Sequence, residues 1–171
     1  MIVMKFGGTS VGNAEAMRRV AGIISGKLDK SPLVIVSAVS KATDALVKIG
    51  KSADSGNLQE AEQLVDWFID RYLTIAEELE LPGDNSYFKE LEDTGRLLLD
   101  LLPQIEKAAG LESRKWQDLC LSRGEFLSTR LLTAYMRMKG IEVEWIDAGD
   151  YMETDSDYGR AMPIKERCLE R

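Results

Sequence analysis

The chain has 171 residues, with 22 basic and 29 acidic side chains, a net charge of −7 and no histidine. Its length suits one ordinary domain, and 44% hydrophobic content with only 4 prolines is typical of a folded soluble protein. The acidic balance argues against a nucleic acid or an anionic membrane as a partner. The lack of histidine excludes Ser-His-Asp and Cys-His nucleophiles, His-based acid–base catalysis and nearly all zinc sites with imidazole ligands.

No apolar stretch approaches the roughly 20 residues of a membrane-spanning helix, and the N-terminus lacks the pattern of a signal peptide. We therefore expect a cytoplasmic protein without a membrane partner. The two cysteines, Cys120 and Cys168, are far apart in the chain and have no metal-type spacing. We expect reduced, mostly structural thiols and no metal site made by protein ligands.

The first 40 residues predict a strand, a helix and a second strand. Residues 2–6 (IVMKF) and 33–36 (LVIV) are short apolar runs bounded by glycine or proline, which is typical of buried strands. Between them Asn13 is a suitable N-cap for an amphipathic helix. The apolar residues of that helix are Met17, Val20, Ala21, Ile24 and Leu28. Such a βαβ unit implies parallel strands.

The middle of the chain predicts three helices. An amphipathic helix is expected over residues 42–53, and two longer apolar stripes follow over 58–79 and 88–105, separated by a Pro-Gly-Asp break. The two stripes predict an antiparallel helical hairpin over about 57–109, with Pro103 expected to kink or restart the second helix. A coiled-coil partner is one interpretation of the stripes. Burial against the rest of the domain is favoured, because each stripe runs for only about three heptads.

The last part of the chain predicts a further long helix and a third strand. The helix is expected from about Ser113 to Met138, ending at Gly140, and the strand over residues 141–146. The polar tail has one turn signal at residues 158–160, and its final residues, 164–171, read as the beginning of another helix.

The segment KFGGTS, residues 5–10, stands where the first strand gives way to the first helix. Parallel sheets bind anions here, because helix N–H groups are unpaired and glycines let the backbone approach a phosphate closely. Lys5 would neutralise a phosphoryl group, and Thr9 and Ser10 add hydroxyl donors. The spacing matches neither the Walker nor the dinucleotide fingerprint. The alternative is a tight turn whose glycines adopt positive φ.

Residues 37–44 follow the second strand and are rich in hydroxyl groups. They are expected at the same sheet edge as the glycine segment, where they would face the same ligand. Capping of the next helix by Ser40 or Thr43 is the alternative.

In the long helix near the end, Ser122 and Glu125 are three residues apart and share a face beside Gly124. The glycine would let a ligand approach, and the carboxylate would hold a substrate amine. An exposed glutamate on a solvated helix face is the alternative.

Three motifs, in the same order along the chain, resemble the aspartokinase branch of the amino-acid kinase family. They are KFGGTSV at residues 5–11, SRGEFLS at 122–128 and GRAMP at 159–163. The first is much more specific than a generic glycine loop, and together they span nearly the whole chain. The resemblance implies phosphorylation of the side-chain carboxylate of L-aspartate with ATP and Mg²⁺, the first step toward lysine, threonine, methionine and isoleucine.

The resemblance also implies an α/β fold, with a mostly parallel three-layer sheet and an inserted helical hairpin. Residues 1–171 would be the N-terminal part of the catalytic domain, without the nucleotide-binding second half or the regulatory domains. The isolated chain is then expected to lack turnover. The alternatives are the N-terminal part of a bifunctional aspartokinase/homoserine dehydrogenase, or a non-catalytic module that binds a ligand or a subunit. The open sheet edges suggest a homo-oligomer.

Matching positions give each site residue an implied role. Lys5 is the expected catalytic residue. The residues expected to bind the ATP phosphates are Lys5, Gly7, Gly8, Thr9 and Ser10. Those expected to bind aspartate are Ser37, Thr43 and Glu125. The missing histidine fits this chemistry, because a carboxylate with a pKa of about 4 is ionised at pH 7 and needs no general base.

Overall fold

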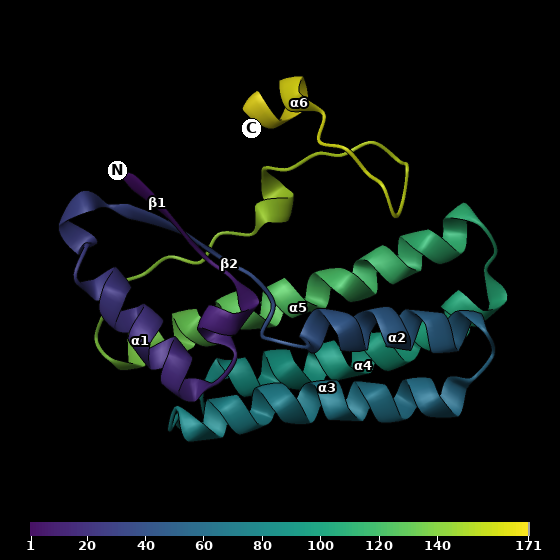
Figure 1. Ribbon diagram of the computed structural model, residues 1–171, viewed down its shortest axis with the longest axis horizontal. Helices are drawn as coiled ribbons and strands as arrows, with labels where there is room; N and C mark the ends of the chain where they lie inside the picture. Colours follow the sequence, from purple (N-terminus) through teal and green to yellow (C-terminus); the bar gives the residue numbers. More distant parts are fainter. Residues whose placement is uncertain (171) are drawn as a thin grey trace.

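The computed structural model describes residues 1–170 and begins with the expected βαβ unit (Figure 1). Strands β1 (Ile2–Phe6) and β2 (Pro32–Val36) pair in parallel, with Lys5 opposite Ile35. Helix α1 (Ala14–Ser25) connects them, after the short helix η1 (Gly8–Val11). Asn13 caps α1 as predicted, because its Oδ1 accepts a hydrogen bond of 2.8 Å from the backbone N–H of Ala16.

One residue, Leu28, was wrongly assigned to the apolar stripe of α1. Leu28 lies beyond the end of α1, in the short helix η2 (Leu28–Lys30), and is exposed. The helix ends at Gly26, whose N–H bonds to the carbonyl of Gly22 at 3.1 Å, and the N–H of Lys27 bonds to the carbonyl of Ile24 at 2.9 Å. The chain has therefore already turned away from the helical spacing before Leu28.

Four helices form the body of the molecule beside the sheet (Figure 1). They are α2 (Ala42–Asp54), α3 (Leu58–Glu78), α4 (Ser86–Lys107) and α5 (Leu111–Met138). Helices α3 and α4 occupy the range expected for the hairpin. Their apolar stripes are buried within this chain: Phe68, Tyr72 and Leu98 have no exposed surface. Burial against the domain, rather than a coiled-coil partner, is therefore the correct interpretation.

Pro103 neither ends nor restarts a helix, because α4 continues through it to Lys107. The expected restart is therefore wrong, for a local reason. Proline removes the hydrogen bond to the carbonyl four residues earlier, at Leu99. Both Pro103 and Leu99 lie on the exposed side of α4, where water can hydrate that carbonyl and reduce the cost.

The third strand expected over residues 141–146 is also wrong, since within residues 1–170 the sheet contains only β1 and β2. The alternating apolar pattern is satisfied by packing on α5. The Trp145 ring lies edge-on to Phe126, with ring centroids 5.8 Å apart, and the Arg130 guanidinium lies 4.7 Å from the Trp145 ring centroid. Alternating exposure of side chains is typical of a strand, but it does not by itself require pairing with another strand.

The two faces of the sheet differ strongly in exposure. On one face, Phe6 and Val34 pack against the core, and Val36 belongs to it. On the other, Val3, Leu33 and Ile35 are 61%, 43% and 47% exposed. Lys5 alternates onto this second face. Within the described residues, helices therefore cover only one face of the sheet.

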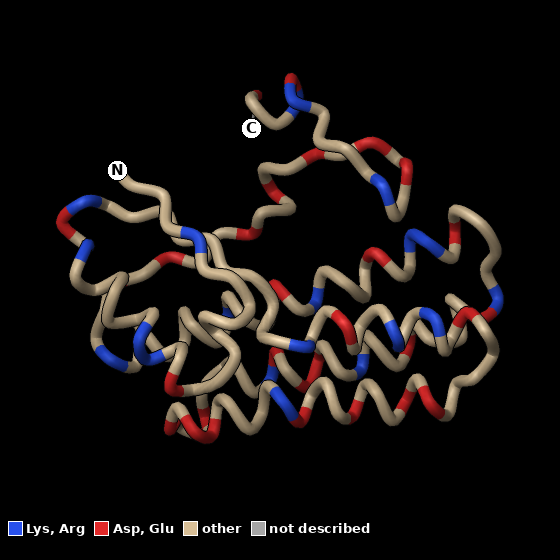
Figure 2. The backbone as a smooth tube through the Cα atoms, viewed as in Figure 1, with Lys and Arg blue, Asp and Glu red and all other residues tan. Residues whose placement is uncertain are grey.

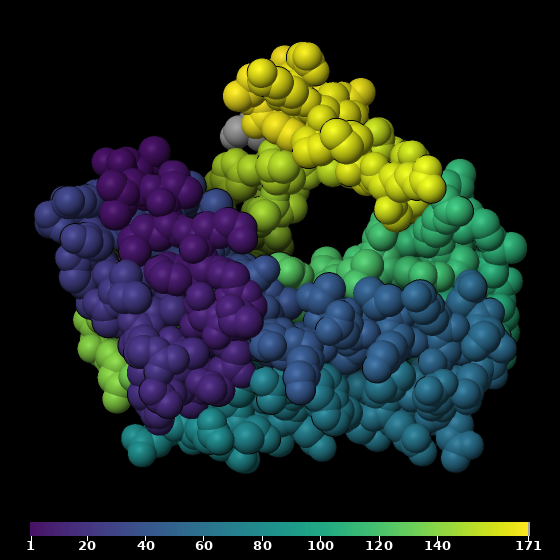
Figure 3. Space-filling model, viewed as in Figure 1, coloured from purple at the N-terminus to yellow at the C-terminus, as the bar shows by residue number. Residues whose placement is uncertain are grey.

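The tail folds back over the helical body (Figure 3). After the short helix η3 (Ala148–Asp150), a backbone bridge joins Thr154 to Pro163, and the five-residue helix α6 (Lys165–Leu169) follows. Between them the chain turns at Gly159, where φ is +82°, as the predicted turn requires. Figure 3 shows the tail arching over a hollow above the helices. The predicted helix start over 164–171 is present in α6, and Arg171 lies outside the described residues.

Charged residues of both signs are interspersed along the helices (Figure 2). Among residues 1–170, no helix is long and apolar enough to cross a membrane. Both cysteines are free thiols, as expected. Burial raises the pKa of Cys120 to about 12, so its thiol is unreactive at neutral pH.

Two adjacent leucines of α4 give a direct test of the hairpin core. Leu98 is completely buried, whereas Leu99 is 40% exposed. We expect Leu98→Ala to lower the free energy of unfolding by about 2–5 kcal/mol, because it leaves a cavity. Leu99→Ala should cost less than about 1 kcal/mol. Urea denaturation followed by circular dichroism measures both, and equal losses would contradict the packing described here.

Candidate functional site

The glycine loop, residues 7–12, leaves β1 and runs close to the segment that leaves β2. A Cβ atom placed on Gly8 would lie 2.6 Å from the carbonyl oxygen of Ala38, closer than any side chain permits. Neither Gly7 nor Gly8 has positive φ, so the turn interpretation of these glycines is wrong. Gly8 is needed for close approach between two backbones, whereas Gly7 has nothing within 4 Å of its Cβ position and is open.

The hydroxyl loop, residues 37–43, lies against the glycine loop at the carboxyl end of the sheet. The N–H of Ser37 bonds to the carbonyl of Phe6 at 3.0 Å, and the N–H of Ser40 bonds to the carbonyl of Gly8 at 3.1 Å. The predicted meeting of the two segments at one sheet edge is therefore confirmed. It extends parallel pairing of β1 and β2 by one step beyond the strands.

Capping by Ser40 or Thr43, the alternative interpretation of the hydroxyl loop, is not what the structure shows. The N-cap position of α2 is Lys41, which has a left-handed φ of +71° and makes no side-chain capping bond. The Thr43 side chain is exposed and Ser37 is half-buried. The hydroxyl groups of Ser40 and Thr43 therefore do not cap α2.

Helix α5 brings Glu125 to the hydroxyl loop. The N–H of Ala38 donates a hydrogen bond of 3.2 Å to Oε1 of Glu125. The contact is possible because Gly124 lies against the loop: a Cβ there would be 2.8 Å from the Ala38 Cβ and 3.2 Å from Cδ1 of Leu46. Glu125 is therefore exposed to solvent but also bonded to the hydroxyl loop. The alternative interpretation, an exposed glutamate on a solvated helix face, accounts for only part of this.

Ser122, in contrast, is not brought to the hydroxyl loop by any of its hydrogen bonds. Its Oγ donates to the carbonyl of Leu119 at 2.8 Å and accepts from the Arg123 guanidinium. Lys5 lies on the exposed face of the sheet, and Thr9 and Ser10 are exposed in η1. The structure thus brings together the glycine loop, the hydroxyl loop and Glu125.

Two further residues of α3 contact these segments and were not singled out from the sequence. Arg71 donates to the carbonyl groups of Gly12 and Ser40, and the Tyr72 hydroxyl donates to the carbonyl of Gly124 at 2.7 Å. Tyr72 lies within the apolar stripe predicted over residues 58–79, which gave it no role beyond the core. Arg71 has no local signal at all, since a single arginine beside a buried residue is common on amphipathic helices.

The GRAMP motif of the tail, residues 159–163, contacts α5 at Asp118, seven residues before Glu125. The N–H of Gly159 donates a hydrogen bond of 2.7 Å to Oδ2 of Asp118. Beside it is an open depression of about 180 Å³ between α2 and α5. Asp118 precedes Glu125 by seven residues, which places both on the same side of the helix.

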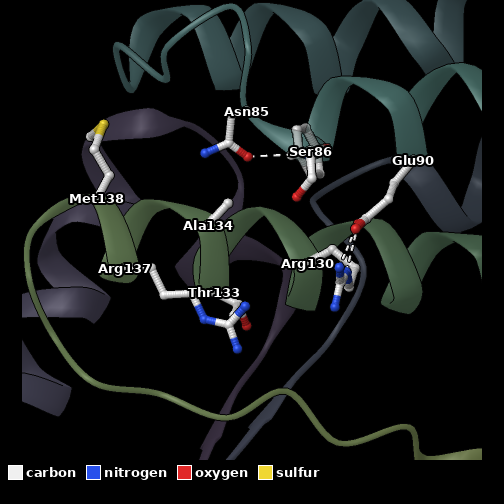
Figure 4. A pocket seen from close by; sticks show the side chains of 9 residues that line it. Asn85, Ser86, Glu90, Arg130, Thr133, Ala134, Arg137 and Met138 are labelled. Carbon is white, nitrogen blue, oxygen red and sulfur yellow. Dashed lines mark hydrogen bonds and ion pairs between the residues drawn. The ribbon is translucent and has the colours of Figure 1, made fainter.

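A second depression, of about 100 Å³, lies between the start of α4 and the second half of α5 (Figure 4). Its charged groups hold structural elements together. Arg130 forms an ion pair with Glu90 of α4, and Arg137 donates to the carbonyl of Val143 at 3.0 Å. The Arg130–Glu90 hydrogen bond raises the pKa of Arg130 further. We regard this depression as a junction between elements.

Gly124 supplies the test of this geometry. Gly124→Ala would force a methyl group into Ala38 and Leu46, and we expect a loss of about 1–3 kcal/mol in the free energy of unfolding. The control is Gly22→Ala in α1, where nothing lies within 4 Å of the Cβ position. There the better helix propensity of alanine should stabilise the protein by about 0.5–1 kcal/mol. Opposite signs in thermal denaturation are the expected result; a neutral Gly124→Ala would contradict the contact.

Comparisons with known proteins show relatives that are similar in sequence and fold. The chloroplastic aspartokinase 1 of Arabidopsis thaliana is 36% identical over 150 residues, which cover 85% of this chain and 25% of that protein. The lysine-sensitive aspartokinase 3 of Escherichia coli is 32% identical over 163 residues, covering 95% of this chain and 34% of that protein. The chain therefore spans only about a quarter to a third of the length of these relatives.

A solved structure of E. coli aspartokinase III in complex with aspartate and ADP superimposes with a TM-score of 0.84 and 29% identity. The match covers 99% of this chain and 36% of that one, so the α/β fold with its helical hairpin is confirmed as part of that fold. The sequence pattern of the Amino acid kinase family matches residues 1–169. Because that match covers nearly all of it, the chain belongs to the Amino acid kinase family.

Proposed function

We propose that the protein to which this chain belongs transfers the γ-phosphoryl group of ATP to the side-chain carboxylate of L-aspartate, forming 4-phospho-L-aspartate. The observation that carries the proposal is the meeting of the glycine loop, the hydroxyl loop and Glu125 at one edge of the sheet. The similarity to aspartokinases supports it, including one solved with aspartate and ADP.

The phosphate end of ATP would lie over the glycine loop. Gly7 is open, with no atom within 4 Å of its Cβ position, so a phosphate can approach the backbone there. Thr9 and Ser10 are exposed beside it and would donate hydrogen bonds. We assign Lys5 to neutralise the transferring group, together with phosphate binding by Gly7 and Gly8. Charge neutralisation of this kind is the main task in phosphoryl transfer.

Aspartate would lie between the hydroxyl loop and α5. Ser37 and Thr43 would donate hydrogen bonds near the reacting carboxylate, and Glu125 would bind the amino group. The N–H of Ala38 already holds one oxygen of Glu125 at 3.2 Å, so the carboxylate is oriented before a substrate arrives. The aspartate carboxylate is itself the nucleophile and is ionised at pH 7. The protein therefore has to align two anions and needs no general base.

Mg²⁺ would accompany ATP and neutralise charge between its β- and γ-phosphates. Among the described residues, no group of three or more His, Cys, Asp or Glu side chains is placed to hold a metal ion. We propose that the ion binds together with the ATP phosphates, which are themselves ligands for Mg²⁺.

We further propose that these residues form the N-terminal part of a larger catalytic domain and are inactive alone. The uncovered sheet face supports this, because Val3, Leu33 and Ile35 present a contiguous apolar surface beside Lys5. A chloroplastic bifunctional aspartokinase/homoserine dehydrogenase of A. thaliana is 31% identical over 93% of this chain. The similarity of this portion thus extends to enzymes with either one or two activities.

Lys5→Ala in the full-length protein should lower kcat for aspartyl phosphate formation by about 100- to 1000-fold, because an unneutralised phosphoryl group is left in the transition state. Trapping the product with hydroxylamine, as aspartyl hydroxamate, measures the rate. Lys48→Ala, at an exposed position of α2, is the control and should retain wild-type activity. If Lys5→Ala retains wild-type kcat, Lys5 does not neutralise the transferring phosphoryl group.

Glu125→Gln should raise KM for aspartate by about 10- to 100-fold, because a charge-assisted hydrogen bond to the amine becomes a neutral one. The amide oxygen still accepts the N–H of Ala38, so the loop stays in place. KM for ATP should change little. Glu112→Gln, at an exposed position near the start of the same helix, is the control, and steady-state kinetics with each substrate varied separates the two effects.

A further inference from the structure

Helix α3 contacts the site through Arg71, whose guanidinium joins the two loops. Its Nη2 donates a hydrogen bond of 2.8 Å to the carbonyl of Gly12, at the end of the glycine loop. Its Nε donates a bond of 3.3 Å to the carbonyl of Ser40 in the hydroxyl loop. A planar guanidinium presents its donors in a fixed geometry, so this one side chain restrains the separation of the two loops.

The next residue, Tyr72, joins the hydroxyl loop to α5. Its hydroxyl donates to the carbonyl of Gly124 at 2.7 Å and lies 3.0 Å from Oγ of Ser128 and 3.4 Å from the N–H of Val39. The side chain has no exposed surface. Burial raises the pKa of Tyr72 far above its usual value, so the hydroxyl remains a neutral donor throughout the physiological range.

We propose that Arg71 and Tyr72 are positioning residues that hold the glycine loop, the hydroxyl loop and α5 in the separation needed for transfer. Neither residue belongs to the three motifs, and neither is assigned a contact with ATP or aspartate. Their role in phosphoryl transfer rests on the function proposed above. That they hold the two loops and α5 together does not depend on it.

The physical reason is the geometry of phosphoryl transfer. The donor phosphate and the acceptor carboxylate are held by different loops, and reacting atoms must approach to about 3–3.5 Å. A misplacement of about 1 Å can cost about 100-fold in rate. Direct bonds between the loops near their tips include the one from the N–H of Ser40 to the carbonyl of Gly8. The contacts made by α3 add restraints from outside the sheet.

The test uses two variants of the full-length protein that keep side-chain bulk. Arg71→Lys replaces two fixed donors with one nitrogen, and Tyr72→Phe removes only the hydroxyl. We expect kcat to fall by about 10- to 100-fold, with KM for ATP and aspartate changed by less than about 3-fold. The control Arg18→Lys alters another guanidinium-to-backbone bond, between α1 and the carbonyl of Glu78, and should leave kcat unchanged.

Amide hydrogen exchange provides a readout that does not depend on activity. In Arg71→Lys and Tyr72→Phe, the amides of Ala38 and Ser40 should exchange about 10-fold faster than in the wild type, because each variant removes a restraint on the hydroxyl loop. Arg18→Lys should leave these two amides unchanged.

The outcomes separate this proposal from the proposed function. Faster exchange together with reduced kcat supports positioning. Unchanged exchange overturns it, as does faster exchange with unaltered kcat in an active protein, since the contacts would then serve stability alone. If the wild type shows no aspartate kinase turnover, the proposed function fails, and exchange by itself decides whether Arg71 and Tyr72 brace the loops.

Discussion

The contact between Ala38 and Gly124 is the constraint on which the site depends. Ala38 lies at the point where β2 has ended, and only a residue without a side chain lets α5 approach it so closely. That approach allows Glu125 to accept the N–H of Ala38. It also brings the carbonyl of Gly124 within reach of the Tyr72 hydroxyl. One missing side chain thus sets the relative positions of β2, α3 and α5.

The same principle operates at Gly8, where the backbone of the glycine loop touches the carbonyl of Ala38. Ala38 therefore contacts two glycines: its carbonyl oxygen lies against Gly8, and its Cβ lies against Gly124. Small residues at such crossings make the distances insensitive to side-chain rotation, because there are no rotamers to choose. Phosphoryl transfer from ATP to aspartate, the function proposed above, would benefit from this rigidity, because alignment of the two anions is what the site would contribute to the rate.

Much of the local structure could be predicted from the sequence. Periodicity located the βαβ unit and the long helices, and Asn13 was recognised as a cap, because these features depend on neighbours within one or two turns. The errors have separate causes. Leu28 lies beyond the end of α1 at Gly26. At Pro103 solvent on the exposed side of α4 lets the helix continue, and the segment 141–146 packs on α5 instead of joining the sheet.

The site divides in the same way. The sequence by itself determined which segments are candidates for binding phosphate and a carboxylate substrate, since glycines close to a lysine and hydroxyls after a strand are local features. Only the tertiary structure decided why Gly8 and Gly124 must be glycine, what Glu125 contacts and that Arg71 and Tyr72 hold the loops. These contacts join residues 30 or more positions apart. The separation of such partners in space is set by the packing of whole helices, which no local pattern encodes.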